Sequence, residues 1–399
     1  MPLSHLTLNQ KVWRLSPIYL FYFALFGTFI PYVARFLTEN GLSAAQAGII
    51  VAVVNGVNVF APFLISFLAD KSGRRMVYIR IGYLAIGLFY FLSLFGSGFW
   101  FYLTVFGLFG IFLSAVLPQM ESVAISVLGE QRNRYGQVRL WGSIGFVATV
   151  WLLGFMLDIF SVRVIPILGS ALSLLMFLST FLIPERKAVK SDDPAVVDTP
   201  EAVTGEQAIN WRQVIALLLV ILFWQFSMAP YNTFFDLYMR EHGASAAMSG
   251  FLISFGSFCE IAIFVYIARL FEKYSERSLL LFALAVTVGR WFLLATFPDQ
   301  FLVVLFTQMC HAITFGVVHS VIVHRIGTLF PASRASFGQG LYVAIGAGIG
   351  LFAGNLMAGA LWDGSAKVYL VATFWASLAL VVTWVSVSSD KKDHEAEVA

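Results

Sequence analysis

The residues best suited to chemistry are ionisable side chains that lie inside long apolar runs. They are Glu121, Arg139, Asp236, Glu260, Arg290, His311 and His319. A charge at bilayer depth costs at least about 2.5–3.5 kcal/mol on insertion scales, so residues of this kind are functional candidates by default. A desolvated, paired carboxylate can have its pKa moved far enough to take up and release a proton. The set therefore predicts a buried polar site in which a proton is exchanged.

Depth within the runs separates these candidates. Glu260 and Arg290 lie near the centres of their runs, where snorkelling cannot reach water, so a function is favoured for both. Glu121 and Arg139 lie toward run ends, where interfacial snorkelling is an equally good interpretation. The positions allow a Glu121–Arg139 pair and a Glu260–Arg290 pair.

The two histidines and Asp236 carry weaker signals. His311 and His319 are eight residues apart, which places them on about one face of a helix. A buried neutral histidine bonded to a hydroxyl is the alternative to a functional role. Asp236 closes its run, and the alternative for it is simple exposure to the outer water.

The elements that position these residues are predicted to be membrane-spanning helices. Of the 399 residues, 59% are hydrophobic and 12% charged, against about 25% charged residues in a soluble domain. This composition excludes a soluble enzyme, a disordered chain and a nucleic-acid binder. Runs of about 20 apolar residues predict spanning helices. Twelve such runs cover residues 16–38, 45–68, 76–95, 98–121, 138–160, 164–183, 212–236, 247–268, 278–297, 301–323, 338–360 and 367–387.

The basic residues predict the orientation of the spans. With the N-terminus inside, 20 of the 25 Lys and Arg residues fall on the inner side, four fall outside and Arg290 lies within a span. Such an excess is typical of cytoplasmic loops. We therefore expect a multi-pass protein of a bacterial-type inner membrane, with both termini in the cytoplasm.

One polar stretch divides the chain. Residues 184–211 are polar, contain proline and are acidic at their centre, as is typical of a flexible linker. We predict an all-α membrane protein with a six-helix bundle over 1–183, a cytoplasmic linker over 184–211, a second six-helix bundle over 212–387 and a cytoplasmic tail over 388–399.

The two halves repeat at a fixed offset. ENGLSAAQAG begins at Glu39 and EHGASAAMSG at Glu241, which is 202 residues later. Tyr135-Gly-Gln recurs at the same offset as Phe337-Gly-Gln. Six crossings between the copies keep them parallel, related by an axis along the membrane normal. One large class of transporters has this layout, with a site between the halves near the midplane.

The loop between the second and third runs has the most specific local motif, Asp70-Lys71-Ser72-Gly73-Arg74-Arg75. It resembles the loop 2–3 motif of the major facilitator superfamily, with Ser66 in place of the first glycine of that motif. The resemblance implies a role in conformational switching for this loop. The alternative is a merely basic inner loop. The candidate switch residues are Asp70, Lys71, Gly73, Arg74 and Arg75.

The buried ionisable residues resemble those of the lactose permease branch of that superfamily. Glu121 and Arg139 match its glutamate and arginine, 18 residues apart, and Glu260, Arg290 and His311 match its later charged and histidine positions. In two places the sequence departs from that branch. Phe146 stands where the branch has a tryptophan that stacks on galactoside, and Thr314 stands where it has its proton-carrying carboxylate. Galactoside binding is therefore not expected, and the proton site must lie elsewhere.

A resemblance over nearly the whole chain is to the 3-phenylpropionic acid transporter family, carried by segments such as YGQVRLWGSIGFV and TQMCHAITFGVVH. It implies proton-coupled uptake of a small aromatic carboxylate by alternating access. The implied substrate-binding residues are Glu121, Arg139, Phe146, Arg290 and His311. The proton-coupling candidates are Glu260, Glu121, Asp236, His311 and His319.

Several alternatives to this function stay open. They are a sugar or nucleoside symporter of the same fold and a drug/proton antiporter. An intramembrane enzyme has no supporting motif such as H-E-x-x-H. We expect no cofactor except H⁺ as the coupling ion, no metal, no nucleic-acid partner, a lipid bilayer around the protein and a functional monomer.

Overall fold

The computed structural model describes residues 7–183 and 209–387. Within these ranges every regular element is helical. The predicted tail, and the predicted linker apart from its last three residues, lie outside the described residues.

The helices of the first half run from Leu8 to Ser179. They are α1 (Leu8–Phe29), α2 (Val33–Glu39), α3 (Ala44–Gly56), α4 (Ala61–Ser72), α5 (Arg75–Leu92), α6 (Phe99–Leu128), α7 (Tyr135–Ile159) and α8 (Val164–Ser179). Those of the second half are α9 (Trp211–Glu241), α10 (Ala246–Lys273), α11 (Glu276–Thr296), α12 (Phe301–His311), α13 (Val318–Leu329), α14 (Ala335–Val343), α15 (Leu351–Leu361) and α16 (Lys367–Ser386). Two π-helical segments, Ala312–Val317 and Ala344–Gly350, join α12 to α13 and α14 to α15.

The spans match the twelve predicted runs. Eleven helices of the described chain are long and apolar enough to cross a membrane, and a helix pair bent by 42°, Ala44–Val59 with Ala61–Ser72, makes up to twelve. The bend in that pair falls at Pro62, in the first turn of α4. Proline has no N–H to donate and its ring clashes with the preceding turn, so a break at this point is expected.

The repeat is visible in the local geometry. Ser43 caps the start of α3 by accepting from the N–H of Gln46, and Ser245 caps α10 by accepting from the N–H of Met248. The two serines are 202 residues apart. The same turn chemistry thus starts the second span of each half.

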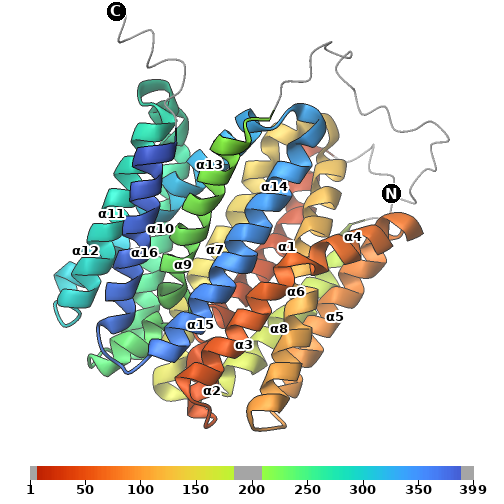
Figure 1. Cartoon of the computed structure of the whole chain (residues 1–399). Coiled ribbons are helices and arrows are strands. Elements are labelled where there is room, and N and C mark those ends of the chain that lie inside the picture. Colours follow the sequence, from red (N-terminus) through yellow and green to blue (C-terminus); the bar gives the residue numbers. More distant parts are fainter. Residues whose placement is uncertain (1–6, 184–208, 388–399) are drawn as a thin grey trace, which may run out of the picture.

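The helices pack mainly within their own half, and a smaller set of helix contacts joins the two halves (Figure 1). In the first half α1 packs on α7 and α8, and in the second α9 packs on α15 and α16. Between the halves, α7 packs on α10 and α3 packs on α15. We call the end where α9 begins and α16 ends the terminal face, and the end where α2 lies the far face (Figure 1).

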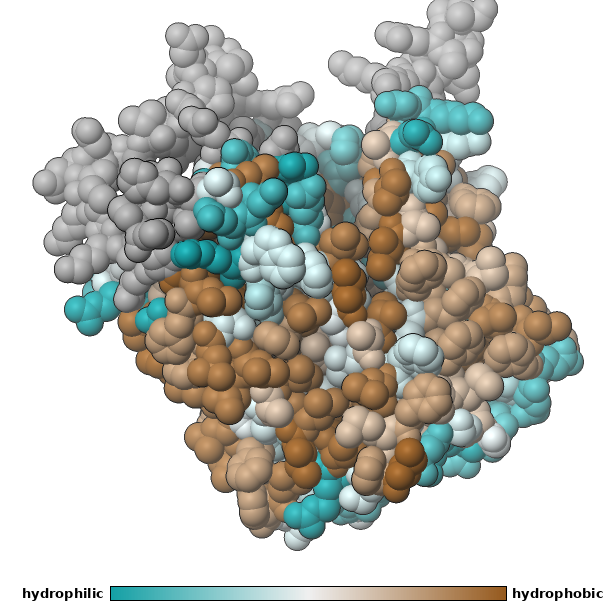
Figure 2. Space-filling view, turned by 180° about the vertical axis from the view of Figure 1, so that it is seen from behind, coloured by the Kyte–Doolittle hydropathy of each residue, from teal (hydrophilic) through white to brown (hydrophobic). Residues whose placement is uncertain are grey.

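The surface is that of a protein embedded in lipid. Figure 2 shows brown apolar side chains over the middle of the molecule, with teal hydrophilic side chains gathered toward its two ends. Many large apolar side chains are more than half exposed, among them Leu152, Phe258 and Phe306. Such a surface suits a hydrocarbon layer with polar headgroups on both sides.

Candidate functional site

A cavity of about 280 Å³ lies between the halves. Its wall comes from α1, α7, α9, α10, α12 and the first π-helical segment, and combines aromatic rings with a few polar groups. The lining residues are Phe23, Phe26, Ile30, Pro31, Arg139, Ser143, Phe146, Tyr231, Asn232, Ile253, Ser257, Glu260, Ile261, Phe264, His311 and Phe315. An apolar cavity with few convergent polar groups is the usual form of a small-molecule site.

Four of the predicted site residues lie in this wall: Arg139, Phe146, Glu260 and His311. Arg290 and Glu121 do not belong to the lining, although both were expected there. Tyr231 and Asn232 belong to it but were not among the predicted site residues. A signal for them was present, because they form a polar pair directly after Pro230 in an otherwise apolar run.

Glu260, His311 and Arg290 form a chain that ends at the cavity. Glu260 Oε2 lies 3.4 Å from His311 Nε2, and Arg290 Nη1 lies 3.1 Å from His311 Nδ1. A guanidinium has only donors, so Nδ1 must accept and the hydrogen of a neutral imidazole sits on Nε2, facing the carboxylate. The direct Glu260–Arg290 pair that the sequence positions allow is not formed in this conformation, because the imidazole of His311 lies between the two charges.

Arg290 is held behind the cavity wall and is only 1% exposed. Its guanidinium donates to Thr314 Oγ1 at 3.0 Å and lies 4.3 Å from the ring centre of Tyr231 and 4.4 Å from that of Trp291. Cation–π contacts stabilise a desolvated guanidinium. The same tyrosine faces the cavity, so Arg290 positions Tyr231 and His311 from behind.

Arg139 reaches the cavity from α7. Its guanidinium carbon lies 3.8 Å from the ring centre of Phe23, and within the described residues no carboxylate approaches it within ion-pair distance. Glu121 instead accepts a hydrogen bond from the Tyr135 hydroxyl at 3.1 Å. The Glu121–Arg139 pair that the sequence positions allow is thus not formed, and Arg139 presents an unpaired cation to the cavity.

Gly142 makes room for this arrangement. A Cβ at that position would lie 2.5 Å from Phe23 Cδ2 and 2.9 Å from Arg139 Nη1. A side chain at this position would therefore push the ring and the guanidinium apart.

His311 and His319 share one helix face, as their spacing predicts. Phe315 stacks between them, with ring centres 5.6 Å from His311 and 5.8 Å from His319. His319 Nδ1 lies 2.6 Å from the hydroxyl of Tyr342. His319 therefore has the hydroxyl partner of a buried histidine, and it does not line the cavity.

Asp236 lies at the far face, and the interpretation of it as a solvent-exposed end residue is wrong. It is 1% exposed, and its Oδ2 lies 3.9 Å from Arg35 Nη1 of the other half. Arg35 also pairs with Glu39 at 2.9 Å, and Glu39 pairs with Arg240 of the second half at 2.7 Å. These four residues form the far-face cluster, which joins the halves.

A second polar contact crosses the far face between α7 and α10. The Asp158 carboxylate accepts from the backbone N–H of Ala246 at 2.8 Å and of Ala247 at 2.9 Å. Gly154 and Gly250 allow the two helices to approach, since a Cβ at Gly250 would lie 2.8 Å from the carbonyl oxygen of Val150. The halves are therefore tightly closed against each other on this side.

The loop after α4 forms a turn supported by its own side chains. Gly73 ends α4 with a φ of 65°, a left-handed conformation that glycine adopts without strain. Arg75 pairs with Asp70 at 2.6 Å and also bonds Ser122 of α6. Lys71 and Arg74 extend into solvent. Asp70 thus pairs with the basic end of its own loop.

A comparison with known protein families identifies the family of this chain. The model of the MFS_1 like family matches residues 12–372. The chain belongs to the MFS_1-like family. Its relatives are membrane transporters of the major facilitator superfamily.

Two curated relatives and one solved structure extend the comparison. The chain is 29% identical over 356 residues to the probable 3-phenylpropionic acid transporter of Escherichia coli (strain K12), covering 86% of this chain and 89% of the relative. It is 26% identical to the maltose permease of Geobacillus stearothermophilus, covering 86% of each. The fold matches that of the nucleoside transporter NupG with a TM-score of 0.82 at 14% identity, over 96% of this chain and 100% of that one. The protein is a multi-pass membrane transporter.

Proposed function

We propose that this transporter takes up a small aromatic carboxylate together with a proton, by alternating access. One observation carries the proposal: the unpaired guanidinium of Arg139 in a cavity lined by phenylalanine rings. A guanidinium binds a carboxylate through two parallel hydrogen bonds. Phe23, Phe26 and Phe146 offer faces and edges to an aromatic ring.

The proton is carried by Glu260, with His311 as its partner. Both line the cavity that would hold the substrate. A substrate carboxylate in that cavity would repel a charged Glu260, so binding of the anion and protonation of Glu260 favour each other. Such coupling between two ligands is reciprocal. Among the other coupling candidates, Asp236 sits in the far-face cluster, and His319 and Glu121 sit away from the wall.

The proposed orientation places both termini and residues 184–211 in the cytoplasm of a bacterial cell, with the protein in the inner membrane and active as a monomer. The excess of basic residues in the predicted inner loops supports it. With this orientation the far face is external and closed, and the substrate arriving from outside enters after the halves part there.

Uptake into proteoliposomes tests the proposed function. Radiolabelled 3-phenylpropionate should accumulate under an inward proton gradient and not after the gradient is collapsed. The uncharged 3-phenylpropanol should not compete for uptake, because it lacks the carboxylate for Arg139. Accumulation of sugars or nucleosides with no competition by 3-phenylpropionate would overturn the proposal, as would proton-driven efflux of a cationic dye from the same vesicles.

A further inference from the structure

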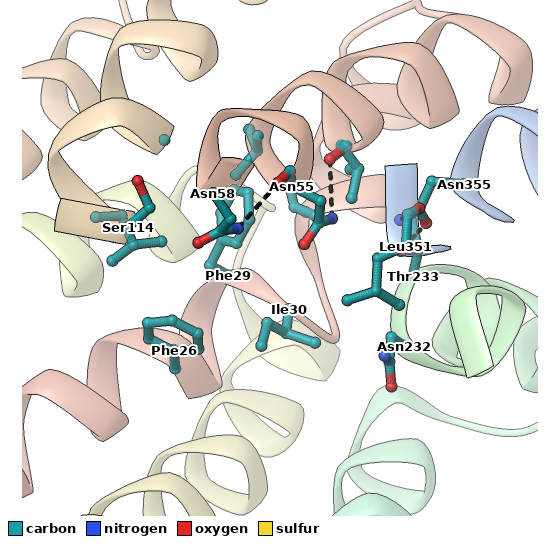
Figure 3. A pocket seen from close by; sticks show the side chains of 15 residues that line it. Phe26, Phe29, Ile30, Asn55, Asn58, Ser114, Asn232, Thr233, Leu351 and Asn355 are labelled. Carbon is teal, nitrogen blue, oxygen red and sulfur yellow. Dashed lines mark hydrogen bonds between the residues drawn. The ribbon is translucent and has the colours of Figure 1, made fainter. Parts of the chain in front are cut away.

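A second, smaller cavity of about 80 Å³ adjoins the central one. Phe26, Ile30 and Asn232 line both cavities, so the two are neighbours across these side chains. Figure 3 shows the second cavity and the side chains around it. We call it the amide chamber after its polar lining, which is Asn55, Asn58, Ser114, Asn232, Thr233 and Asn355.

Both halves of the protein build this chamber. Asn55 of α3, Asn58 of the following turn and Ser114 of α6 come from the first half, and Asn232 of α9 and Asn355 of α15 come from the second. An occupant would therefore touch both halves at once. A group bound there can favour one arrangement of the halves over another.

Part of the lining is fixed by internal hydrogen bonds. Thr233 Oγ1 donates to Asn355 Oδ1 at 2.5 Å, and Asn355 Nδ2 donates to the carbonyl of Leu351 at 2.8 Å. Both side chains are buried. This pair holds α9 and α15 together and forms a rigid wall of the chamber.

The other amides keep unused hydrogen-bonding capacity. Asn55 Nδ2 donates to the carbonyl of Val51 at 2.9 Å and Asn58 Nδ2 to that of Asn55 at 3.0 Å, as the dashed lines in Figure 3 mark. In the described part of the chain neither side-chain oxygen accepts a hydrogen bond, and Asn232 makes none with its side chain. All three amides are partly buried and line the chamber. Their free hydrogen-bonding groups are therefore available to a polar occupant.

The lining also indicates the chemistry of that occupant. The side chains that the structure describes around the chamber include no acid, base or cysteine, and Phe26, Phe29 and Leu113 form its apolar part. An uncharged group with hydroxyls on an apolar frame suits this mixture of amides and rings. A metal cation would leave the phenylalanine faces unused.

We propose that the amide chamber binds the hydroxyl-bearing end of the transported acid while Arg139 binds its carboxylate. The substrate class is then a ring-hydroxylated aromatic acid, with the ring passing Phe26 from one cavity to the other. This inference rests on the proposed function, because it takes the carboxylate at Arg139 as given. It adds Asn58 and Asn232 as the residues that recognise the hydroxyls.

Competition between two acids that differ only in ring hydroxyls tests the inference. Displacement of labelled 3-phenylpropionate is measured with the unlabelled parent acid and with 3-(3,4-dihydroxyphenyl)propionate, on the purified full-length protein. The unmutated protein should bind the dihydroxy acid about tenfold more tightly, as expected for two net hydrogen bonds. Asn58→Leu and Asn232→Leu should each reduce that ratio to about threefold or less.

Asn9→Leu is the matched control, because Asn9 is exposed in the first turn of α1 and far along the chain from the chamber. It should leave the ratio at the value of the unmutated protein. Monodisperse gel filtration of each variant checks folding, and the thermal shift given by each acid provides a second reading of the ratio. Equal binding of the two acids by the unmutated protein, or a ratio unchanged in both chamber variants, would overturn the inference and leave the proposed function standing. Binding of neither acid would overturn the proposed function and the inference with it.

Discussion

At the residue scale, the most informative side chain is Arg139. It lies over Phe23 with its charge unpaired in the described structure, so its planar shape and its charge are both available to a ligand. A lysine would keep the charge but lose the fork geometry and the stacking.

Arg139→Lys should raise the KM for 3-phenylpropionate by about tenfold or more with a smaller effect on the maximal rate, since one bidentate contact is lost. Initial rates in proteoliposomes over a range of substrate concentrations measure this. Arg163→Lys, a change in the exposed turn before α8, serves as the control. An unchanged KM in Arg139→Lys would remove Arg139 from the substrate site.

Glu260→Gln should abolish proton-driven accumulation while leaving counterflow exchange of substrate. The amide keeps the size of the side chain and an oxygen facing His311, but it cannot carry the proton. Accumulation is compared with and without an inward proton gradient, and exchange is measured without any gradient. Equal gradient-driven accumulation by the variant and the parent would exclude Glu260 as the coupling group.

The sequence predicted that these residues lie within spanning helices but did not predict their partners. Hydropathy shows that Glu260 and Arg290 lie near the centres of apolar runs. It does not show how each helix is rotated, and that rotation brings His311 between them. The partner of Asp236 could not be predicted for a similar reason, because Arg35 lies in the other half and far from Asp236 in the sequence.

At the element scale, two features control how the helices meet. The first is close backbone contact between helices of the two halves, which occurs where Gly154 of α7 meets Gly250 of α10 and where Gly48 of α3 meets Gly359 of α15. A Cβ at Gly48 would lie 2.6 Å from the carbonyl oxygen of Asn355. Small residues at such crossings let backbones touch.

Gly250→Leu should hold the far face apart. A Cβ there would lie 2.7 Å from the Tyr32 hydroxyl, 2.8 Å from the carbonyl oxygen of Val150 and 3.2 Å from the Cα of Gly154, so the larger side chain would collide with the backbone of α7 as well as with Tyr32. The test uses a cysteine introduced at Ser257 in the cavity wall, in a background with Cys259 and Cys310 replaced by serine. With Gly250→Leu, this cysteine should react several-fold faster with a membrane-impermeant thiol reagent added from the far side than it does when Gly250 is unchanged. Gly289→Leu is the matched control because a Cβ there meets nothing within 4 Å. Equal labelling rates in the two variants would contradict this role.

The second feature, the π-helical segments, could not be predicted from the sequence. Ala312–Val317 lies between His311 and His319, and a wider turn there helps to stack both rings on Phe315. Such segments are often found at functional sites. An apolar run has the same composition in a π-turn as in an α-turn, so hydropathy carries no sign of it.

At the scale of the whole molecule, the number of spans can be predicted from the long apolar runs, and the repeat from motifs that recur 202 residues apart. Helix ends cannot be predicted in this way. α6 continues to Leu128 although its apolar run ends at residue 121, and α9 continues to Glu241 beyond residue 236. Both predicted runs end at an acidic residue, Glu121 and Asp236, whereas a helix can continue past a charged position, so a hydropathy criterion stops before the helix does.

The even number of spans predicts that both chain ends lie on one side of the membrane. Epitope tags fused at the N-terminus and at the C-terminus should both be protected from protease in intact spheroplasts and both be cleaved after lysis. A cysteine replacing Asp363, in the turn between α15 and α16, serves as the control for the opposite side and should react with an impermeant reagent in intact spheroplasts. Cleavage of only one tag in intact spheroplasts would contradict an even number of crossings.

The contact of Asp158 with the start of α10 has a consequence for how the molecule can cycle. Its carboxylate accepts from two backbone amides that, like all first-turn amides, have no acceptor within their own helix. Water satisfies both the carboxylate and the amides when they part, at little net cost. The contact between α7 and α10 on that side can therefore break and re-form in every turnover, because water replaces its hydrogen bonds and no donor is left unpaired in an apolar environment.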